Sequence, residues 1–492
     1  MDKLKDRRTF RAPEKYARYW HAKLNFIKKE TPYTTDFLCS QPKKHDYRSI
    51  FAADRDRIMY TTSFLRLSAK TQIFTVGSND NVRTRLTHTL EVSQIARTIA
   101  SELGLDVELT EAMALGHDVG HTPYGHIGER TLNKISHEER ASTKVEDFTV
   151  NETSLKNYKG FKHNQQSVRV LVDFSKDISV SNYCLYGIRN HSDLYYDNDI
   201  SSASFYSWYD PFCSFEHQGS RIPSWSFESF VVYWADEIAQ RHHDIEDAYR
   251  CKLIDKSGII NLLSLLLKYF DSKANRFSKK LDDLQKGKDD DFERKLSSFV
   301  VDFYVSAIIS EMSLAITLVA SKYTIKNRND FVGLYPDMKE IDVRTIMYLV
   351  NSGSFTGTDK LFSRELKDII IPSYMVQRQD GKGGFTVRKL VNAYITNPQQ
   401  LPDKYISDIF RRELPRAFSV DDHNQIRAVL SSASLPQDYL EWNPVHSRKA
   451  LRKICESPEG YRRVYPLIFR TIFDYISGMT DSFAHEEYIR LY

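Results

Sequence analysis

Residues 83–129 carry histidine and carboxylate side chains at spacings that suit a metal site. His88 lies four and seven residues before apolar residues of a predicted helix, so its imidazole shares their inward face. His117 lies on the inward face of the next predicted helix, and Asp118 follows it directly. Two imidazoles and a carboxylate on neighbouring helices are typical ligands of a divalent metal. The alternative from these residues alone is a pair of core histidines that hydrogen-bond to the backbone.

A fourth candidate ligand lies on a long helix predicted from about Ser226 to Leu253. Asp236 stands among apolar residues of this helix. A carboxylate in such surroundings needs a charged partner, and a metal held by the other ligands would supply one. Asp244 follows eight residues later, about 12 Å further along the helix axis.

Groups that could act on phosphate lie beside these ligands. Arg85 is nearly one helical turn before His88, and its planar guanidinium suits the oxygens of a phosphate on the metal. The glycine-rich loop of residues 116–129 holds further imidazoles, and Glu129 follows His126 by three residues. A carboxylate beside an imidazole fixes the tautomer of the ring and raises its basicity. An ordinary ion pair at a helix start is the alternative.

The composition is that of an ordinary globular protein, with 41% hydrophobic and 27% charged residues among 492. The net charge of +4 does not indicate nucleic acid by itself, although a polyanionic substrate needs a local basic patch. Five cysteines without a CxxC pair do not indicate a disulfide framework or a zinc ribbon. The basic N-terminus lacks the apolar run of a signal peptide, and apolar clusters such as residues 230–235 are too short for a bilayer. We therefore expect a soluble cytoplasmic protein without a membrane partner.

An ordered set of motifs extends this pattern over most of the chain. Upstream is DRDRIMYTTSFLRLSAKTQIF, followed by RTRLTHTLEVSQIARTIA and GHDVGHTPYGHIGE; downstream are FKHNQQSVR, ADEIAQRHHDIEDA and DYISGMTD. The H…HD pattern with a distant Asp resembles the HD superfamily of metal-dependent phosphohydrolases. The full set more closely resembles the deoxyguanosine triphosphate triphosphohydrolase (dGTPase) family.

The resemblance implies an all-α fold, with an HD-type helical core and a helical C-terminal extension. We expect the core with its N-terminal arm to span residues 1–354, and a C-terminal helical subdomain packed on it to span 355–492. Residues 352–360 and 378–386 are rich in helix breakers and are interpreted as links. The polar residues 136–160 are interpreted as a mobile loop or an insertion.

The resemblance also assigns roles to individual residues. It implies that one divalent ion, Mn²⁺ or Mg²⁺ with iron also possible, binds His88, His117, Asp118 and Asp236. It implies that His126 and Glu129 form the catalytic pair, with His121 and Arg85 stabilising phosphate charge. Contacts to the sugar, the phosphates and the nucleotide are expected from Gln72, His163, Asn164 and Asp244. Gln240 departs from the family, because many members have Tyr at this position.

The activity implied by the resemblance is hydrolysis of a deoxynucleoside triphosphate, dGTP as first guess, to deoxynucleoside and inorganic triphosphate. A homo-oligomer, often a hexamer, and binding of single-stranded DNA are also implied as partners. Two other interpretations stay open. One is a different HD phosphohydrolase, acting as a nucleotidase, a phosphodiesterase or an alarmone hydrolase. The other is a non-catalytic scaffold that binds nucleotides or single-stranded DNA.

Overall fold

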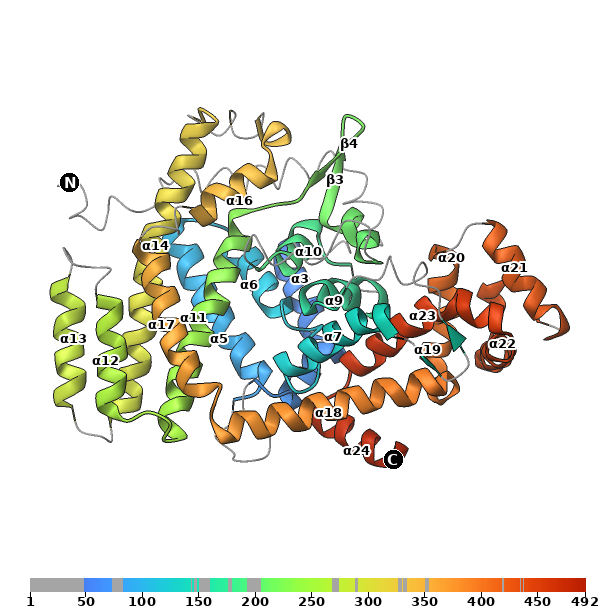
Figure 1. Cartoon of the computed structure of the whole chain (residues 1–492). Coiled ribbons are helices and arrows are strands. Elements are labelled where there is room, and N and C mark those ends of the chain that lie inside the picture. Colours follow the sequence, from blue (N-terminus) through green and yellow to red (C-terminus); the bar gives the residue numbers. More distant parts are fainter. Residues whose placement is uncertain are drawn as a thin grey trace.

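The computed structural model is helical over nearly all of the chain that it describes (Figure 1). It describes residues 48–72, 83–142, 144–145, 148–149, 160–175, 179–192, 205–267, 274–287, 291–325, 330, 334–349, 354–417, 420–433, 435–436 and 438–492. Within these residues the only sheets are two antiparallel pairs of short strands. The predicted all-α fold is therefore confirmed.

Four helices form the centre of the N-terminal part. They are α3 (Ile50–Met59), α5 (Arg85–Leu103), α6 (Val107–Gly116) and α11 (Phe227–Arg250). The α5 helix packs against α6 and α11, and α3 packs against α6. Local sequence signals account for these helix ends: Gly104 ends α5 in the left-handed conformation with φ 68°, and the Asp106 side chain accepts from the Leu109 N–H to cap α6.

Shorter elements surround this centre. They are α4 (Thr62–Arg66), the 3-10 helix η3 (Leu67–Ala69), α7 (His126–Ser142), α9 (His163–Arg169), the π-helical turn η4 (Val170–Phe174), α10 (Asn182–Arg189) and the 3-10 helix η6 (Phe205–Cys213). The strand pairs are β1 (Lys144–Val145) with β2 (Phe148–Thr149), and β3 (Ser214–His217) with β4 (Ser220–Pro223). The prediction of a loop over residues 136–160 is wrong at its start, where α7 continues to Ser142. Of the other residues in this range, 143, 146–147 and 150–159 lie outside the described residues.

A further helical layer covers α5 and α11. It contains α12 (Lys256–Leu267), α13 (Ala274–Lys286), α14 (Phe292–Lys322), the 3-10 helix η9 (Tyr335–Asp337), α16 (Glu340–Leu349) and α17 (Ser354–Ile370). The α14 helix is long and apolar enough to cross a membrane by length and composition, so the expectation that every apolar stretch is too short is wrong. More than half of that stretch is buried, and α14 packs against α5, α11, α13 and α16. Its apolar composition is what a core helix requires.

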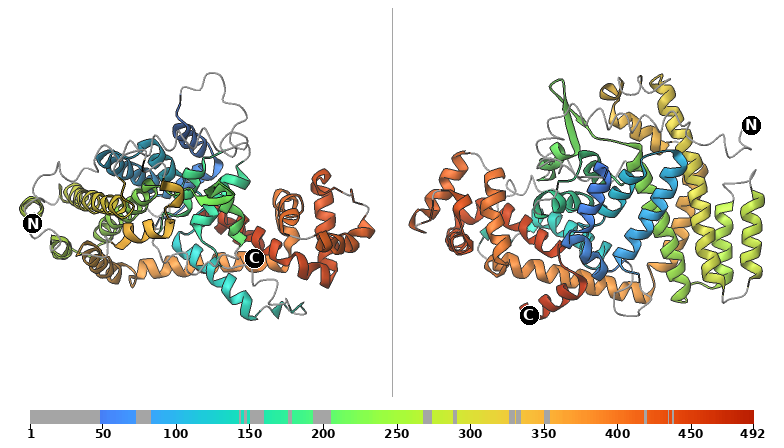
Figure 2. Two further views of the ribbon diagram at one scale, coloured as in Figure 1. Left: turned by 90° about the horizontal axis from the view of Figure 1, so that it is seen from above. Right: turned by 180° about the vertical axis from the view of Figure 1, so that it is seen from behind.

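The C-terminal part continues the all-α fold. It contains α18 (Tyr374–Thr396), η11 (Pro398–Gln400), α19 (Asp403–Asp408), the π-helical η12 (Ile409–Glu413), α20 (Leu414–Ala417), α21 (Val420–Leu430), η13 (Ser431–Ala433), η14 (Tyr439–Glu441), α22 (Pro444–Glu456), α23 (Pro458–Ser477) and α24 (Asp481–Leu491). In both views of Figure 2, α20–α22 lie at one end of the molecule and α12 and α13 at the opposite end.

The predicted links at 352–360 and 378–386 are corrected by two helices. The α17 helix begins at Ser354, and α18 runs without interruption through residues 378–386. Of the glycines in this segment, Gly383 serves close packing instead of a break. A Cβ added at Gly383 would lie 2.8 Å from the Cβ of Tyr124, which directly precedes the loop glycine before α7. Only a residue without a side chain lets the two segments approach this closely.

Two hydrophobic clusters divide the buried side chains. The first extends from α3 through α17 to Val376, and the second contains Leu132 and Ile135 of α7 together with residues from Val387 to Ala484. The α18 helix therefore contributes to both clusters, and it runs along one side of the molecule between them (Figure 1). The domain limits at 354 and 355 stay a prediction.

Candidate active site

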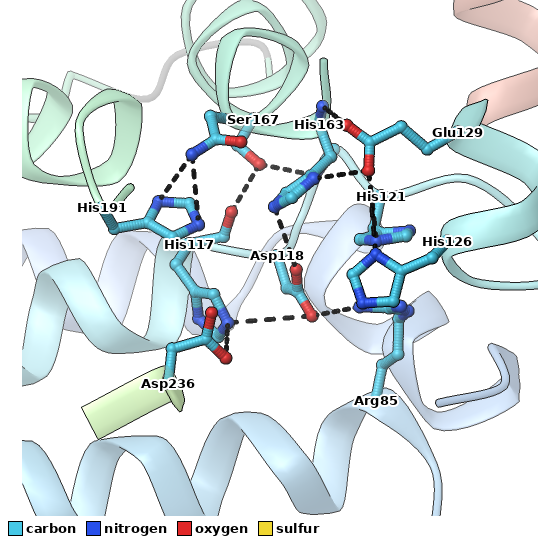
Figure 3. Close-up of polar contacts among 12 residues, drawn as sticks. Arg85, His117, Asp118, His121, His126, Glu129, His163, Ser167, His191 and Asp236 are labelled. Carbon is cyan, nitrogen blue, oxygen red and sulfur yellow. Dashed lines mark hydrogen bonds and ion pairs between the residues drawn. The ribbon is translucent and has the colours of Figure 1, made fainter. Parts of the chain in front are cut away.

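Three core helices bring the four predicted metal ligands together. His88 lies on α5, His117 and Asp118 follow the end of α6, and Asp236 lies on α11. The His88 Nε2 atom lies 2.9 Å from the Asp236 carboxylate, and the His117 Nε2 atom lies 3.8 Å from it. Asp118 lies 3.7 Å from the same His117 atom. We call these four residues the ligand cluster, which Figure 3 shows in part.

The donor atoms of the ligand cluster fit a divalent metal. The His117 Nδ1–H group donates to the Ala114 carbonyl at 2.6 Å, so the Nε2 atom carries the lone pair. This Nε2 atom is buried and has no hydrogen-bond partner, although a buried polar atom normally has one. One ligand atom each from His88, His117 and Asp118 lies within 4.8 Å of the others. Two imidazoles and two carboxylates suit a divalent transition metal.

The carboxylates of the ligand cluster are held in their charged form. Burial would raise the pKa of Asp118, but the charge of Arg85 is the largest of the effects that outweigh burial and hold this pKa well below its usual value. Burial opposes ionisation of Asp236 too, and the hydrogen bond with His88 is the largest of the effects that lower its pKa. Charged carboxylates are the form that binds a metal.

The glycine-rich loop places a second cluster of ionisable side chains beside the ligand cluster. Tyr124 and Gly125 have φ values of 60° and 62°, which turn the chain sharply into α7. Gly120 packs on α9, where an added Cβ would lie 2.2 Å from the Ser167 backbone nitrogen. The loop and the two helices gather the four residues that we call the imidazole cluster: His121, His126, Glu129 and His163 (Figure 3).

Glu129 is hydrogen-bonded to His163, whereas the predicted partner His126 lies at ion-pair distance from it. The His163 Nδ1–H and backbone N–H groups both donate to the Glu129 carboxylate, each at 3.0 Å. His126 Nδ1 is 3.9 Å from this carboxylate, beyond hydrogen-bonding distance, and its side chain is 48% exposed. His121 Nε2 lies 4.0 Å from it. The catalytic pair of His126 and Glu129 therefore stays a prediction.

The two stacked imidazoles of this cluster differ in charge. The rings of His121 and His163 stack with centroids 4.6 Å apart. Burial and the charge of Arg85 hold the pKa of His121 well below its usual value. Burial lowers the pKa of His163 as well, but the carboxylate of Glu129 outweighs it and raises this pKa. We expect a neutral His121 beside a His163 that is protonated more readily.

Arg85 connects the two clusters. Its Nη1 atom donates to Asp118 at 2.5 Å, and the ion pair is almost fully buried. The Nε and Nη2 atoms of the same guanidinium are buried without a partner. The unpaired donors lie close to the loop, since Nη2 is 3.3 Å from the position that a Cβ on Gly125 would take. A guanidinium in this state is ready to donate to an anion.

The predicted substrate contacts show further unpaired atoms. Gln72 Oε1, Asn164 Oδ1 and Asp244 Oδ1 are all buried without a hydrogen-bond partner. Burial raises the pKa of Asp244 to about 7, against the lowering effect of Arg241 and Lys367. Asp244 thus has its electrostatic neighbours on α11 and α17 and not among the imidazoles. Its place in the sugar contact stays a prediction, as does that of Gln72.

Sequence reasoning missed three residues next to the ligand cluster. His191 packs its ring with the centroid 5.1 Å from that of His117, and burial lowers its pKa to about 3. Its Nδ1–H group donates to the Ile188 carbonyl at 2.6 Å. Glu91 and His243 lie behind His88. Spacing could have identified these two, because Glu91 follows His88 by three residues and His243 follows Asp236 by seven.

The C-terminal helices hold the loop side of the site. At the start of α24, the Asp481 carboxylate accepts from the backbone N–H groups of Thr71 at 2.9 Å and Tyr124 at 2.8 Å. The Lys70 ammonium donates to the Ser477 carbonyl at 2.8 Å and also to the His121 carbonyl. The segment that carries Gln72 and the glycine-rich loop are therefore fixed to the same two helices.

Comparison with known proteins places this site in a family. Residues 85–201 match the model of the HD domain. A deoxyguanosinetriphosphate triphosphohydrolase-like protein of Nitrosomonas europaea is 31% identical over 365 residues, which cover 73% of this chain and 83% of that protein. One of the same name in Geobacter metallireducens is 30% identical, over 73% and 81% of the two chains. Another in Caldanaerobacter subterraneus is 41% identical over 217 residues, 44% and 50% of the two chains.

The HD-domain match begins at Arg85, the first residue of α5, and includes both histidines and Asp118 of the ligand cluster. The relatives in Nitrosomonas and Geobacter extend the similarity well beyond this segment. The chain therefore belongs to the HD phosphohydrolase family, among the deoxyguanosinetriphosphate triphosphohydrolase-like proteins.

Proposed function

We propose that this protein hydrolyses deoxynucleoside triphosphates, with dGTP as the first candidate, to deoxynucleoside and inorganic triphosphate. The names of its relatives support the substrate class. The observation that carries the proposal is the adjacency of the two clusters through Asp118 and Arg85, with unpaired buried donors on the guanidinium. Unpaired donors beside metal ligands fit a substrate that is both anionic and metal-bound.

The ligand cluster would hold one divalent ion, Mn²⁺ or Mg²⁺ by preference. When bound, this ion supplies positive charge to the α-phosphate and favours ionisation of water. Arg85 binds a phosphate oxygen through the Nε and Nη2 donors that the protein leaves unpaired. His121 has a buried Nε2 atom without a partner, which can contact the same phosphate chain.

Proton transfer is the task of the imidazole cluster. Glu129 accepts from His163 Nδ1–H, so it orients this ring and favours its protonated form. His126 is half-exposed on the same side, where it can exchange a proton with solvent or with water beside the phosphate. In the proposed mechanism His126 activates or positions the water, and His163 and Arg85 stabilise charge on the phosphates.

Selectivity for the sugar is assigned to Gln72 and Asp244. Each has a buried oxygen without a partner, and a sugar hydroxyl that donates to it would satisfy it. A site fitted to a 3′-hydroxyl and a bare 2′-carbon excludes a 2′-hydroxyl by a clash or by an unpaired polar group. We therefore expect dNTPs to be cleaved much faster than ribonucleotides.

The test is to supply dGTP and GTP in parallel with Mn²⁺ or Mg²⁺ and to identify the phosphate product by chromatography. The proposal expects inorganic triphosphate from dGTP and almost no product from GTP. Orthophosphate or pyrophosphate would indicate another HD phosphohydrolase. Equal rates on the two nucleotides would remove the sugar role of Gln72 and Asp244. Binding without turnover would indicate a nucleotide-binding scaffold.

Assembly and location belong to the same proposal. We expect a homo-oligomer, with a hexamer as the expected form. Binding of single-stranded DNA and a cytoplasmic location also stay predictions. Light scattering of the purified chain, with and without a single-stranded oligonucleotide, measures the first two.

A further inference from the structure

A row of buried and partly buried side chains continues from His88 of the ligand cluster. His88 faces Asp236 with its Nε2 atom, and its Nδ1 atom lies 3.4 Å from His243 Nδ1. His243 Nε2 lies 2.6 Å from a carboxylate oxygen of Glu91. The other oxygen of Glu91 contacts His242 Nδ1.

All the side chains of this row lie on two helices. His88 and Glu91 lie on α5, and the two histidines lie on α11 together with Asp236. These helices pack directly on each other in the first hydrophobic cluster. His88 and His243 are almost fully buried, so water does not replace their partners. The same two helices thus carry two metal ligands, His88 and Asp236, and the residues that support His88.

When His88 binds a metal through Nε2, the hydrogen-bond donors and acceptors of His88, His243 and Glu91 can be assigned in only one way. The ligating ring is neutral, so its Nδ1 atom carries the hydrogen and needs an acceptor. The atom within reach is His243 Nδ1, which accepts only if the hydrogen of that ring is on Nε2. A hydrogen on His243 Nε2 needs an acceptor in turn, and Glu91, which as a carboxylate only accepts, supplies it.

We propose that His243 and Glu91 form a relay that fixes the tautomer and orientation of His88, and that this relay sets the metal affinity of the site. The relay rests on the proposed metal site and extends it by two positioning residues that do not touch the metal or the substrate. Without it the lone pair of His88 can move to Nδ1, and the Nε2–H group would then donate to Asp236 instead of ligating. Removal of such outer partners typically costs about 10- to 100-fold in metal affinity.

The test compares two substitutions of nearly equal shape. In His243→Asn the side-chain oxygen takes about the place of Nδ1 and still accepts from His88, whereas His243→Leu has no acceptor there. Mn²⁺ binding is followed by the EPR signal of the free ion, with thermal melting as the measure of folding. We expect His243→Leu to lose about 10- to 100-fold in Mn²⁺ affinity, and His243→Asn to retain most of it. Equal losses in both variants, or no loss in either, would overturn the relay.

His242 provides the matched control. It is adjacent in sequence and contacts the same Glu91 carboxylate, while its Nε2 atom lies 3.1 Å from Glu246 instead of near His88. His242→Gln should therefore bind Mn²⁺ within about threefold of the wild type, well short of the roughly 10- to 100-fold loss expected of an outer partner. A loss equal to that of His243→Leu would show that the whole carboxylate cluster acts only by packing, against the relay.

The wild-type protein separates this inference from the proposed function. Binding of one Mn²⁺ per chain that His243→Leu leaves unchanged would overturn the relay and leave the metal site intact. No Mn²⁺ binding by the wild type would overturn both. Two ions per chain, with the second lost in His242→Gln, would make Glu91 and His243 ligands themselves, since Glu91, His242 and His243 also offer ligand atoms within 4.8 Å of one another. That result too would overturn the relay.

Discussion

The ligand cluster and the imidazole cluster meet where Asp118 of the first lies 3.8 Å from His163 of the second, but they are supported in different ways. The ligand cluster is carried by α5, α6 and α11, and its supporting atoms lie on the same helices, as with Ala114 behind His117. The imidazole cluster is carried by α7, α9 and a loop, and the backbone of this loop is fixed from far along the chain, by Asp481 directly and by Lys70, which also bonds to Ser477. Metal binding and proton transfer should therefore be separable by substitution.

The largest effect is expected from a metal ligand. Asp236→Ala should abolish both metal binding and turnover, a greater loss than the about 10²- to 10⁴-fold that one acid–base group contributes. Its side chain is 28% exposed, so the variant should still fold. Elemental analysis of the purified variant measures the bound metal. Full retention of metal at wild-type affinity would remove Asp236 from the ligand cluster.

A substitution in the imidazole cluster should affect turnover and spare the metal. His126→Ala is expected to lower kcat by about 10²- to 10⁴-fold, with Mn²⁺ affinity unchanged because His126 lies outside the ligand cluster. Steady-state kinetics on dGTP and an Mn²⁺ titration are the two measurements. If kcat is unchanged, the role moves to His163, the imidazole that Glu129 contacts directly.

A substitution outside both clusters tests the support of the loop. Asp481→Asn keeps an acceptor oxygen but loses the charge that binds Thr71 and Tyr124. We expect kcat/KM to fall about tenfold and stability to fall by about 1–3 kcal/mol, the usual cost of disrupted buried hydrogen bonds. Mn²⁺ affinity should stay at the wild-type value. A parallel loss of Mn²⁺ affinity would contradict the separation of the two clusters.

The smallest effect concerns the pH dependence of stability. Burial lowers the pKa of Lys70 to about 7 from its usual value of 10.5. Between these values the unfolded chain binds a proton that the folded chain releases, so stability rises with pH from about 7 upward, by at most about 1.4 kcal/mol per pH unit. Below pH 7 both states are protonated and this slope vanishes.

Lys70→Met removes this titration. Urea unfolding between pH 7 and pH 9 should show a rising stability for the wild type and a flatter profile for the variant. The difference between the two profiles isolates Lys70, because the other titrating groups are common to both proteins. Parallel profiles would mean that the Lys70 ammonium stays charged near Asp481.

The two clusters also differ in how well they could be predicted. His88 and His117 could be placed on inward faces because the helical period converts spacing into direction within one element. The partner of Glu129 could not be placed in this way. His163 lies 34 residues further along, and its contact depends on how α9 packs across α7. The glycines of 378–386 misled for a related reason, because none of them ends α18 and Gly383 permits close packing on Tyr124.

The sequence by itself determined the all-α fold, the helix ends at Gly104 and Asp106, and the ordered motifs that place the chain in its family. These depend on interactions within one element or on short patterns, so they can be derived from local order. The tertiary structure decided which imidazole Glu129 contacts, that Asp481 holds the loop, and that Glu91 supports His88 through His243. Such contacts join segments that are distant in the chain, and only the packing of whole helices fixes the distances between their side chains.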